Sequence, residues 1–541
     1  MTNHPFKSGP SRGQLSFLPP SIEDYVGREN VVRAIDAFVC GLDVEKLGFR
    51  HAGRSEGVGQ PPYHPADLLK LHIYGYLNQV RSSRRLACEA GRNLEVIWLL
   101  KGLQPGYRTI ATFRKDNWAA FKAANREFVL LARALDLVSG ELVAIDGSFF
   151  HGDASKGSIA TGKKLSAQLA ALDRDIEAYG RALETNDSAE TRASSGEDRG
   201  DDRRDGGGAS ERMTALMEQR AELQADLGRL EESGETQLSR TDEDARLLTK
   251  NGQTVAGYNV QIAVDEKHKL IVASEVVNDG NDSGQLYAMA RAAKDALGAE
   301  TLQVAADVGY YNGATLKSCE EGGIVAYVPP PERTGRLKAQ HRFSHQDFAY
   351  DREADAYRCP AGSLLKPTKG RKNNTGGRIE IRYVSRKAVC DACPLRARCV
   401  TAKVPTRTIH RWEHEEVIER HCQRMESAGG IMRRRAGLVE HPFGTLKCRA
   451  GYRHFLVRGF DKVRGEWSLM ALCYNFARVL SIIGFDRFLA CLAKKTAERA
   501  LLRLLRATVT AIWRPGILLG LFRPIMTRMA QTTPLRFNPA L

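Results

Sequence analysis

The sequence contains 541 residues, of which 80 are Lys or Arg and 64 are Asp or Glu, so its formal net charge is +16, and 43% of its residues are hydrophobic. This length and composition exclude a mini-protein and a wholly disordered chain, and at about 150 residues per domain they predict three or four domains. The positive excess indicates a polyanionic partner such as nucleic acid, because neutralising phosphates releases counterions.

Nothing in the sequence predicts export or membrane insertion. A membrane-spanning helix needs roughly 18 apolar residues without charges, and the nearest segment, 469–492, carries Arg478 and Asp486. The N-terminus, MTNHPFKSGPSRG, lacks the apolar stretch of a signal peptide. Most of the 11 cysteines stand alone, as reduced cytosolic thiols do. We therefore expect a cytoplasmic protein without a membrane partner.

The first ordered region has the pattern of a helical domain. Apolar residues recur at helical spacing from Ala66 to Val80, and a second helix is predicted after Ser82. A third is predicted after Thr109, with three aromatic or aliphatic residues facing inward: Ile110, Phe113 and Phe121. The remaining surface is basic, which favours a DNA-binding domain; the alternative is a helical bundle with a solvated basic face.

From Leu142 the pattern becomes extended, in the strand LVAIDGSFF, and then helical again. Apolar residues at heptad spacing occupy 165–183 and 213–230, which predicts an antiparallel coiled-coil hairpin, with a dimerising coiled coil as the alternative. Between them, residues 184–211 contain no large apolar side chain, as in a disordered link.

Extended structure resumes with YNVQIAV and LIVASEVV, which flank the polar turn DEKHK and predict a β-hairpin. A helix over 286–297 then leads to the strands in TLQVAADVGYY and GGIVAYVP. This order, in which two strands carry an acid, is the chain order of a ribonuclease H-like α/β core interrupted by inserts.

Two acids have similar settings. Asp146 and Asp307 each end an apolar strand, and a glycine follows directly or one residue later. A carboxylate in a buried strand costs several kcal/mol unless it is paired or coordinated. Adjacent strands that present both carboxylates to a divalent metal would explain them, since Mg²⁺ prefers oxygen ligands. The alternative is that each aspartate caps a turn or the following helix.

A third acid, Glu440, lies in a basic segment. Residues 431–464 contain nine Lys or Arg and two acids. These surroundings keep a carboxylate ionised, which suits a metal ligand. If a helix begins near Glu440, with Pro442 in its first turn, then Lys447 lies two turns later on the same face.

The order Asp146, Asp307 and Glu440, with VEHPFGTLK around the glutamate, resembles the DDE transposases of bacterial insertion sequences. More narrowly, it is similar to those whose third motif has Tyr, Arg, Glu and Lys in sequence. The stretches LQPGYRTIATFRK, TDEDARLL, GYNVQIAVD and RGFDKVRGEW, and a four-cysteine insert, also resemble that family, over roughly residues 24–480. No aromatic residue stands in the place of the family tyrosine. Arg435 precedes Glu440 by five residues, whereas the family motif implies four, so the family arginine has three interchangeable candidates: Arg433, Arg434 and Arg435.

The resemblance implies a mechanism. Asp146, Asp307 and Glu440 would hold two Mg²⁺ or Mn²⁺ ions, one activating water or a 3′-hydroxyl and the other stabilising the leaving oxygen. Lys447 and one of the three arginines would contact phosphate, and Arg458 and Lys462 the DNA backbone. The substrates would be the double-stranded element ends and target DNA, bound by a homodimer.

Two alternatives have other activities. One is a non-catalytic DNA-binding or regulatory derivative of a transposase, because the stretch from about Thr496 has no family counterpart. The other is a metal-dependent nuclease that cleaves DNA without joining strands.

Four cysteines are grouped. Cys390 and Cys393 have the two-residue gap of a zinc knuckle, and Cys359 and Cys399 lie near enough in sequence to complete a structural Zn²⁺ site. Reduced free thiols are the alternative.

We expect an α/β protein whose ribonuclease H-like core is interrupted by the coiled-coil hairpin and by the cysteine-containing insert. Its expected parts are a helical N-terminal DNA-binding domain (1–137), the first part of the core (138–160), the hairpin with its link (161–238), the second part of the core (239–335), the insert with its possible zinc site (336–425), the final core helices with the third acid (426–480) and a basic tail (481–541).

Overall fold

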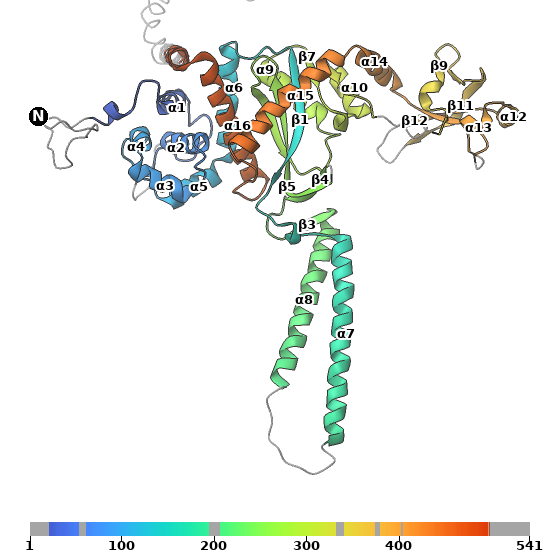
Figure 1. The fold of residues 1–541 in the computed structure, drawn as a ribbon, viewed down its shortest axis with the longest axis horizontal. Helices are drawn as coiled ribbons and strands as arrows, with labels where there is room; N and C mark the ends of the chain where they lie inside the picture. The colour runs from blue at the N-terminus through green and yellow to red at the C-terminus, as the bar shows by residue number, and fades with distance from the viewer. Residues whose placement is uncertain are drawn as a thin grey trace, which may run out of the picture. The chain divides into compact units, whose positions relative to one another are not determined.

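The computed structural model describes residues 21–53, 61–193, 206–250, 252–331, 340–373, 379–401, 404–495 and 497. They belong to two compact units, one within residues 1–127 and 472–541 and the other within residues 128–471 (Figure 1). Residues 194–205 of the link expected at 184–211 and most of the basic tail expected at 481–541 lie outside the described residues. The other residues of the expected disordered link, 184–193 and 206–211, are helical instead, because the two long helices extend into it. In the described part, no helix has the length and apolar character needed to cross a membrane.

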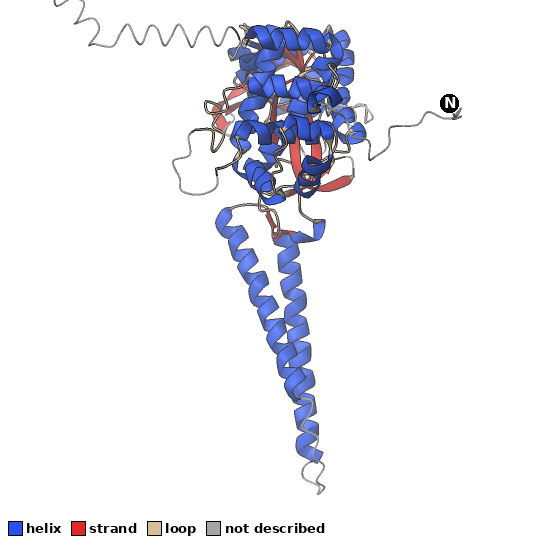
Figure 2. Ribbon diagram, turned by 90° about the vertical axis from the view of Figure 1, so that its left-hand side faces the viewer, coloured by secondary structure: helices blue, strands red, loops and turns tan. Residues whose placement is uncertain are grey.

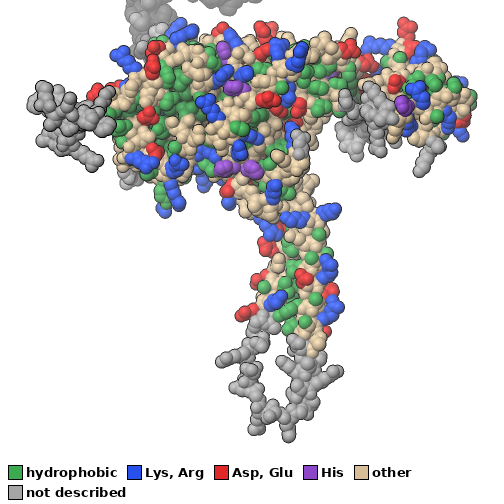
Figure 3. Space-filling view, viewed as in Figure 1, with side chains coloured by type: hydrophobic (Ala, Val, Ile, Leu, Met, Phe, Trp, Pro, Cys, Tyr) green, Lys and Arg blue, Asp and Glu red, His purple; other side chains and the backbone are tan. Residues whose placement is uncertain are grey.

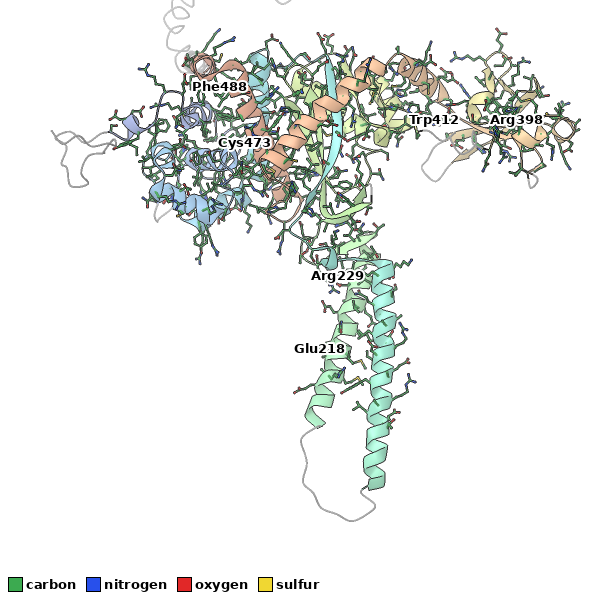
Figure 4. The ribbon with its side chains drawn as sticks, viewed as in Figure 1. Glu218, Arg229, Arg398, Trp412, Cys473 and Phe488 are labelled. Carbon is green, nitrogen blue, oxygen red and sulfur yellow. The ribbon has the colours of Figure 1, made fainter. Side chains whose placement is uncertain are left out.

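The first unit is helical. The last part of α16 (Phe460–Ile483) packs with the N-terminal helices: the rings of Phe38 and Phe476 lie 6.0 Å apart, and Cys473 Sγ lies 3.7 Å from the carbonyl oxygen of Ile73. Figure 4 labels Cys473 in this helix. The other helices of the unit are α1 (Val31–Cys40), α2 (Pro65–Leu77), α3 (Ser83–Arg92), α4 (Leu94–Leu99), α5 (Tyr107–Asp116) and the first part of α6 (Trp118–Ala134).

The single helix predicted after Thr109 is two helices, α5 and α6, that meet at Asn117. This residue is buried, and its side-chain amide donates to the carbonyl oxygen of Phe113 at 2.9 Å. Its Oδ1 accepts from the backbone N–H of Arg50 at 2.7 Å. The asparagine side chain thus takes over a backbone carbonyl at the end of α5 and ends the helix there. The predicted inward residues Ile110, Phe113 and Phe121 are all buried.

A six-stranded sheet forms the centre of the second unit. Its order is β4 (Arg246–Lys250), β5 (Gln253–Asp265), β1 (Leu142–His151), β7 (Leu302–Ala305) and β8 (Ile324–Tyr327), with β6 (Ile271–Val277) also paired to β5. Strand β1 is antiparallel to β5 and parallel to β7. The predicted hairpin is confirmed as β5 and β6, and the predicted helix as α9 (Leu286–Leu297).

Helices pack on this sheet. Helix α9 contacts β6, β5, β1 and β7, and α10 (Gly313–Glu321) packs beside α9 and β8. Helix α15 (Gly429–Gly444) crosses the sheet in front of β1 (Figure 1) and contacts β1, β5 and β7. The sheet and these helices position the candidate site.

Two long helices, α7 (Gly162–Ala193) and α8 (Gly206–Ser233), interrupt the chain after β1 (Figure 2). Their apolar residues pack along a shared seam, and Figure 3 shows hydrophobic side chains between them. An ion pair between Arg220 and Asp173, 2.6 Å apart, crosses the pair. The short strands β2 (Ile159–Thr161) and β3 (Gln237–Ser239) pair where the helices begin and end.

A second sheet forms the insert before α15. Its order is β13 (Thr408–Trp412), β12 (Ile379–Val384), β11 (Leu364–Asn373), β10 (Ala356–Arg358) and β9 (Ala349–Asp351). Phe348, Tyr357, Leu365, Tyr383 and Ile409 form its small core. The short helices α12 (Lys387–Asp391) and α13 (Arg396–Cys399) lie between β12 and β13, and α14 (Glu415–Glu426) leads to α15.

The helix predicted to begin near Glu440 begins at Gly429 instead, so Pro442 lies inside it and not in its first turn. Proline lacks the N–H that would bond to the carbonyl four residues earlier. The chain nevertheless remains helical and changes to a π-helical turn, η5 (Thr445–Arg449). Burial of Phe443 and Leu446 stabilises this irregular segment.

Packing between α7 and α8 predicts the effect of a core truncation. Leu223→Ala removes a buried side chain of the seam, and we expect it to weaken the helix pair by about 2 kcal/mol. Hydrogen exchange should then speed up roughly thirtyfold in both helices. Met217→Ala, at an exposed position of the same helix, is the control. Equal acceleration of hydrogen exchange by the two variants would contradict the packing of α7 against α8 along this seam.

Candidate active site

Strand pairing brings the two aspartates to the same end of the sheet. Ala144 of β1 pairs with Ala305 of β7 in a parallel register, and Asp146 and Asp307 each follow two residues later. Asp146 does not end its strand as predicted, because β1 continues to His151, whereas Asp307 follows the end of β7. The parallel register, and not a shared strand end, places the two residues side by side. The two carboxylate side chains are 22% and 30% exposed, so both remain accessible from solvent.

Arg435 of α15 lies between them. Its Nη2 is 3.0 Å from Asp146 Oδ1 and 3.7 Å from Asp307 Oδ2, and its side chain is 13% exposed. Of the three interchangeable arginines, the structure places Arg435 against the acids. Arg434 forms an ion pair with Glu266, and Arg433 donates to the carbonyl oxygen of Gly429 in its own helix.

Both aspartates also make the local bonds expected of turn-forming residues. Asp146 Oδ1 accepts from the N–H of Gly147 at 2.9 Å. Asp307 caps the 3₁₀ turn η3 (Val308–Tyr310) by accepting from the N–H of Gly309 at 2.9 Å. Turn capping and a shared site are therefore compatible, because each carboxylate has a second oxygen.

Burial raises the pKa of the Asp146 carboxyl above its usual value, Arg435 opposes this effect, and the neighbouring Asp307 adds to it. Two carboxylates beside one guanidinium leave a net negative charge. Their oxygens are the ligand type that Mg²⁺ and Mn²⁺ prefer, and a divalent cation would favour the ionised form of Asp146.

Glu440 is exposed on α15, five residues after Arg435. Among the described residues it forms no hydrogen bond or ion pair, and no three acid, histidine or cysteine side chains there lie at distances that could hold a metal ion. The structure thus brings Asp146 and Asp307 together but does not bring Glu440 to them.

Lys447 reaches β1 from the π-helical turn. Its Nζ donates to Ser148 Oγ at 2.7 Å and to the carbonyl oxygen of Phe149, and it lies 4.3 Å from the centre of the Phe150 ring. Burial lowers the pKa of Lys447 to about 8. The Lys447 side chain therefore contacts the strand that carries Asp146, although the start of α15 differs from the one predicted.

The two other predicted DNA contacts are farther along the chain. Arg458 forms an exposed ion pair with Asp153 at 2.7 Å, and Lys462 is half-buried on the first turn of α16. The structure does not place either of them against the two aspartates.

The four cysteines of the insert line one small cavity of about 30 Å³. Tight turns lie at two of them: the N–H of Gly362 donates to the carbonyl of Cys359 at 2.8 Å, and that of Cys393 to the carbonyl of Cys390 at 3.3 Å. Burial raises the pKa of the Cys399 thiol, and the other three thiols contribute to this increase.

Sequence reasoning missed Asp282. It lies in the loop between β6 and α9, and its buried carboxylate accepts from the side-chain amides of Asn259 and Gln261. The signal in the sequence was weak: this is one of several polar residues in the turn-like stretch NDGNDSG, which has no strand pattern.

Two family models match the sequence. A transposase DDE domain matches residues 358–480, which include the four cysteines, Arg435, Glu440 and Lys447, and a transposase domain, DUF772, matches residues 20–116. A search of curated proteins finds no match.

Among solved structures, the piggyBac transposase synaptic complex with hairpin DNA, determined by cryo-electron microscopy, aligns with 95% of this chain and 87% of that chain. The identity is 8% and the TM-score 0.29, so this likeness supports no conclusion about the fold. The family assignment depends on the two sequence matches, both of them to transposase domains. Both matched segments, residues 20–116 and 358–480, correspond to transposase domains, and these matches support a DNA transposase of the insertion-sequence DDE type.

Proposed function

We propose that this transposase cuts DNA at the ends of its insertion sequence and joins the freed 3′-hydroxyls to target DNA, with Asp146, Asp307 and Glu440 as ligands for two divalent metal ions. The observation that carries the proposal is the pair of solvent-accessible carboxylates on β1 and just after the parallel strand β7, with a guanidinium as their immediate partner. Glu440, the proposed third acid, lies within the matched DDE domain.

The donor set fits Mg²⁺ or Mn²⁺. Bound there, the metal ions would activate the attacking oxygen and stabilise the leaving oxygen. The chain's own groups would position the DNA: Arg435 is the cation nearest the carboxylates, and its planar guanidinium can bind two phosphate oxygens at once. Lys447 adds a second positive charge, which contacts the strand that carries Asp146.

Glu440 would complete the ligand set only after a change in α15. Arg435 lies on the same helix as Glu440. A single movement of α15 could therefore bring Glu440 toward the metal ions and Arg435 toward a DNA phosphate. Pro442 interrupts the hydrogen-bond ladder two residues after Glu440, and a π-helical turn follows. Such irregular segments are weak points of a helix and are frequent at functional sites.

We further propose that the six-stranded sheet is a ribonuclease H-like core, that α7 and α8 are a coiled-coil hairpin inserted into it, and that a homodimer binds double-stranded DNA. The support is the strand order with its two acids, the apolar seam of the helix pair and the net charge of +16.

The direct test is cleavage of DNA that carries the ends of the element, with Mg²⁺ or Mn²⁺. Asp146→Asn, Asp307→Asn and Glu440→Gln should each reduce cutting by roughly a thousandfold, because each removes a ligand of the charge-stabilising metals. DNA affinity in a gel-shift assay should remain.

Glu426→Gln, at an acid of α14 outside the candidate site, is the matched control and should cut normally. Full activity of the Glu440 variant would remove this residue from the proposed ligand set. Cutting without joined product would indicate a nuclease in place of a transposase.

The lowered pKa of Lys447 predicts that the affinity for end DNA depends on pH. Its pKa of about 8 lies below the usual value, so the ammonium loses its proton as pH increases from 7 to 9. If Lys447 contacts phosphate, affinity for end DNA should fall over this range by about tenfold, the value of one charge-assisted hydrogen bond. Binding titrations at fixed ionic strength measure this change.

Lys447→Arg should flatten the pH profile, since a guanidinium remains charged at pH 9. Lys447→Met should bind weakly at both ends of the range. An unchanged pH slope in the arginine variant would show that another group titrates.

We also propose that Cys359, Cys390, Cys393 and Cys399 hold a structural Zn²⁺ ion. The support is that all four cysteines line one cavity and that tight turns lie at Cys359 and Cys390. The four thiols do not form a ready metal-binding group in the described structure, so zinc binding would have to draw them closer together. Four thiolates are a closed zinc ligand set. Zinc would favour the deprotonated thiols, so its affinity should decrease as pH falls.

Metal analysis of the purified protein should find about one zinc per chain, as a four-thiolate site predicts. The double variant Cys390→Ser with Cys393→Ser should lose it and unfold the insert at lower temperature. Cys88→Ser, at an exposed cysteine of the first unit, should retain the zinc. Zinc-free protein whose stability does not respond to added zinc or chelator would disprove the site.

A further inference from the structure

A buried acid lies directly behind the proposed catalytic pair. Asp282, which is 6% exposed, follows β6 in the loop that leads to α9. Its Oδ1 accepts from Asn259 Nδ2 at 2.8 Å and from Gln261 Nε2 at 2.7 Å, and its Oδ2 is 3.4 Å from Lys250 Nζ. The three donors come from β5 and β4, so the loop is fixed to the strands beside β1.

This group packs against the backbone next to Asp146. A Cβ atom on Gly147 would lie 2.7 Å from Asp282 Oδ1 and 3.0 Å from Asn259 Oδ1, and closer still to Gln261 Nε2. Real Cβ atoms do not approach neighbours at the first of these distances, so a side chain at 147 would displace the network. The glycine after Asp146 therefore permits this close approach.

The same network reaches the second aspartate. The Tyr310 hydroxyl donates to Gln261 Oε1, and Tyr310 belongs to the turn that Asp307 caps. A Cβ atom on Gly309 would lie 3.7 Å from Asp282 Oδ2 and 3.0 Å from Asp307 Oδ1. The carboxylate of Asp282 thus lies close to the backbone that follows each proposed ligand.

Asp282 and Arg435 approach β1 from opposite faces. Neighbouring residues of a strand point to opposite faces, so Asp146 faces α15 while the position of Gly147 faces Asp282. The hydrogen bonds and the ion pair of Asp282 are with Asn259, Gln261 and Lys250, and not with Asp146 or Asp307. Its contacts can instead set the position of the backbone that carries the ligands.

We propose that Asp282 is a positioning residue for the proposed metal centre: through Gln261, Asn259 and the backbone of Gly147, it fixes the separation of Asp146 and Asp307. This inference rests on the proposed function. Without the carboxylate, the Gln261 amide loses its acceptor, Asn259 Nδ2 keeps only the carbonyl oxygen of Asp279, and the Gln261–Tyr310 contact loses its support. The backbone segments that carry Asp146 and Asp307 can then separate. The pair then binds a divalent ion more weakly.

The test measures Mn²⁺ affinity directly, by electron paramagnetic resonance of free Mn²⁺ during titration of the full-length protein, so it requires no activity. Asp282→Ala should weaken Mn²⁺ binding by roughly tenfold to a hundredfold, as loss of groups that orient metal ligands does. Asp282→Asn keeps one oxygen as acceptor for both amides, and it should restore most of the affinity. Tyr310→Phe, which alters the network with little change in volume, should produce a smaller loss in the same direction.

Asp265→Ala is the matched control. Asp265 is a fully buried aspartate at the far end of β5 that accepts from the N–H groups of Ser139 and Gly140. The Asp265→Ala substitution should lower the thermal stability of the protein without changing its affinity for Mn²⁺. An equal loss of affinity in this control, or wild-type affinity in Asp282→Ala and Tyr310→Phe, would overturn the positioning role.

Asp146→Asn separates the two proposals. Mn²⁺ binding that this variant does not weaken would mean that the proposed metal centre itself is wrong. Binding that is lost in Asp146→Asn but unchanged in Asp282→Ala would overturn only the role of Asp282.

Discussion

The structure around the candidate site depends on the charge of two carboxylates that the parallel strands β1 and β7 hold side by side. Asp146 and Asp307 each lie two residues after a paired residue of these strands, so the backbone fixes their proximity. Burial raises the pKa of the Asp146 carboxyl, the neighbouring Asp307 adds to this increase, and Arg435 opposes it. Arg435 supplies one positive charge, and a divalent ion would supply two. Helix α15, which carries that arginine and Glu440, is thereby coupled to the charge state of the pair.

The two faces of β1 make different contacts near this pair. The face of Asp146 meets the cations of α15 and η5, Arg435 and Lys447. The opposite face is sealed by the amides of β5 and the carboxylate of Asp282. A single glycine makes this division possible, because any side chain at position 147 would enter the amide network. Charge compensation and backbone positioning can therefore be altered by different substitutions.

Sequence patterns predicted the parts of this arrangement that are local. Runs of apolar residues and turn signals were enough to predict the two candidate aspartates, Asp146 and Asp307, together with the β5–β6 hairpin and α9. The predicted start of α15 was wrong, because the rule that places proline only in the first turn of a helix considers the helix alone. Burial of Phe443 stabilises the irregular segment within the fold. The choice of Arg435 among three arginines was not predictable, since adjacent helix residues differ only in which side of the fold they face.

Asp282 shows a stricter limit of sequence reasoning. Its loop looks like any polar turn, and its partners lie on β4 and β5, more than twenty residues earlier, so no short motif contains the interaction. What distinguishes it is the combination of a buried charge with a glycine that leaves room for it. A buried carboxylate persists only where several donors satisfy it, and here those donors come from the strands beside the proposed ligands. The polar network is therefore part of the site's architecture and not only of the loop's stability.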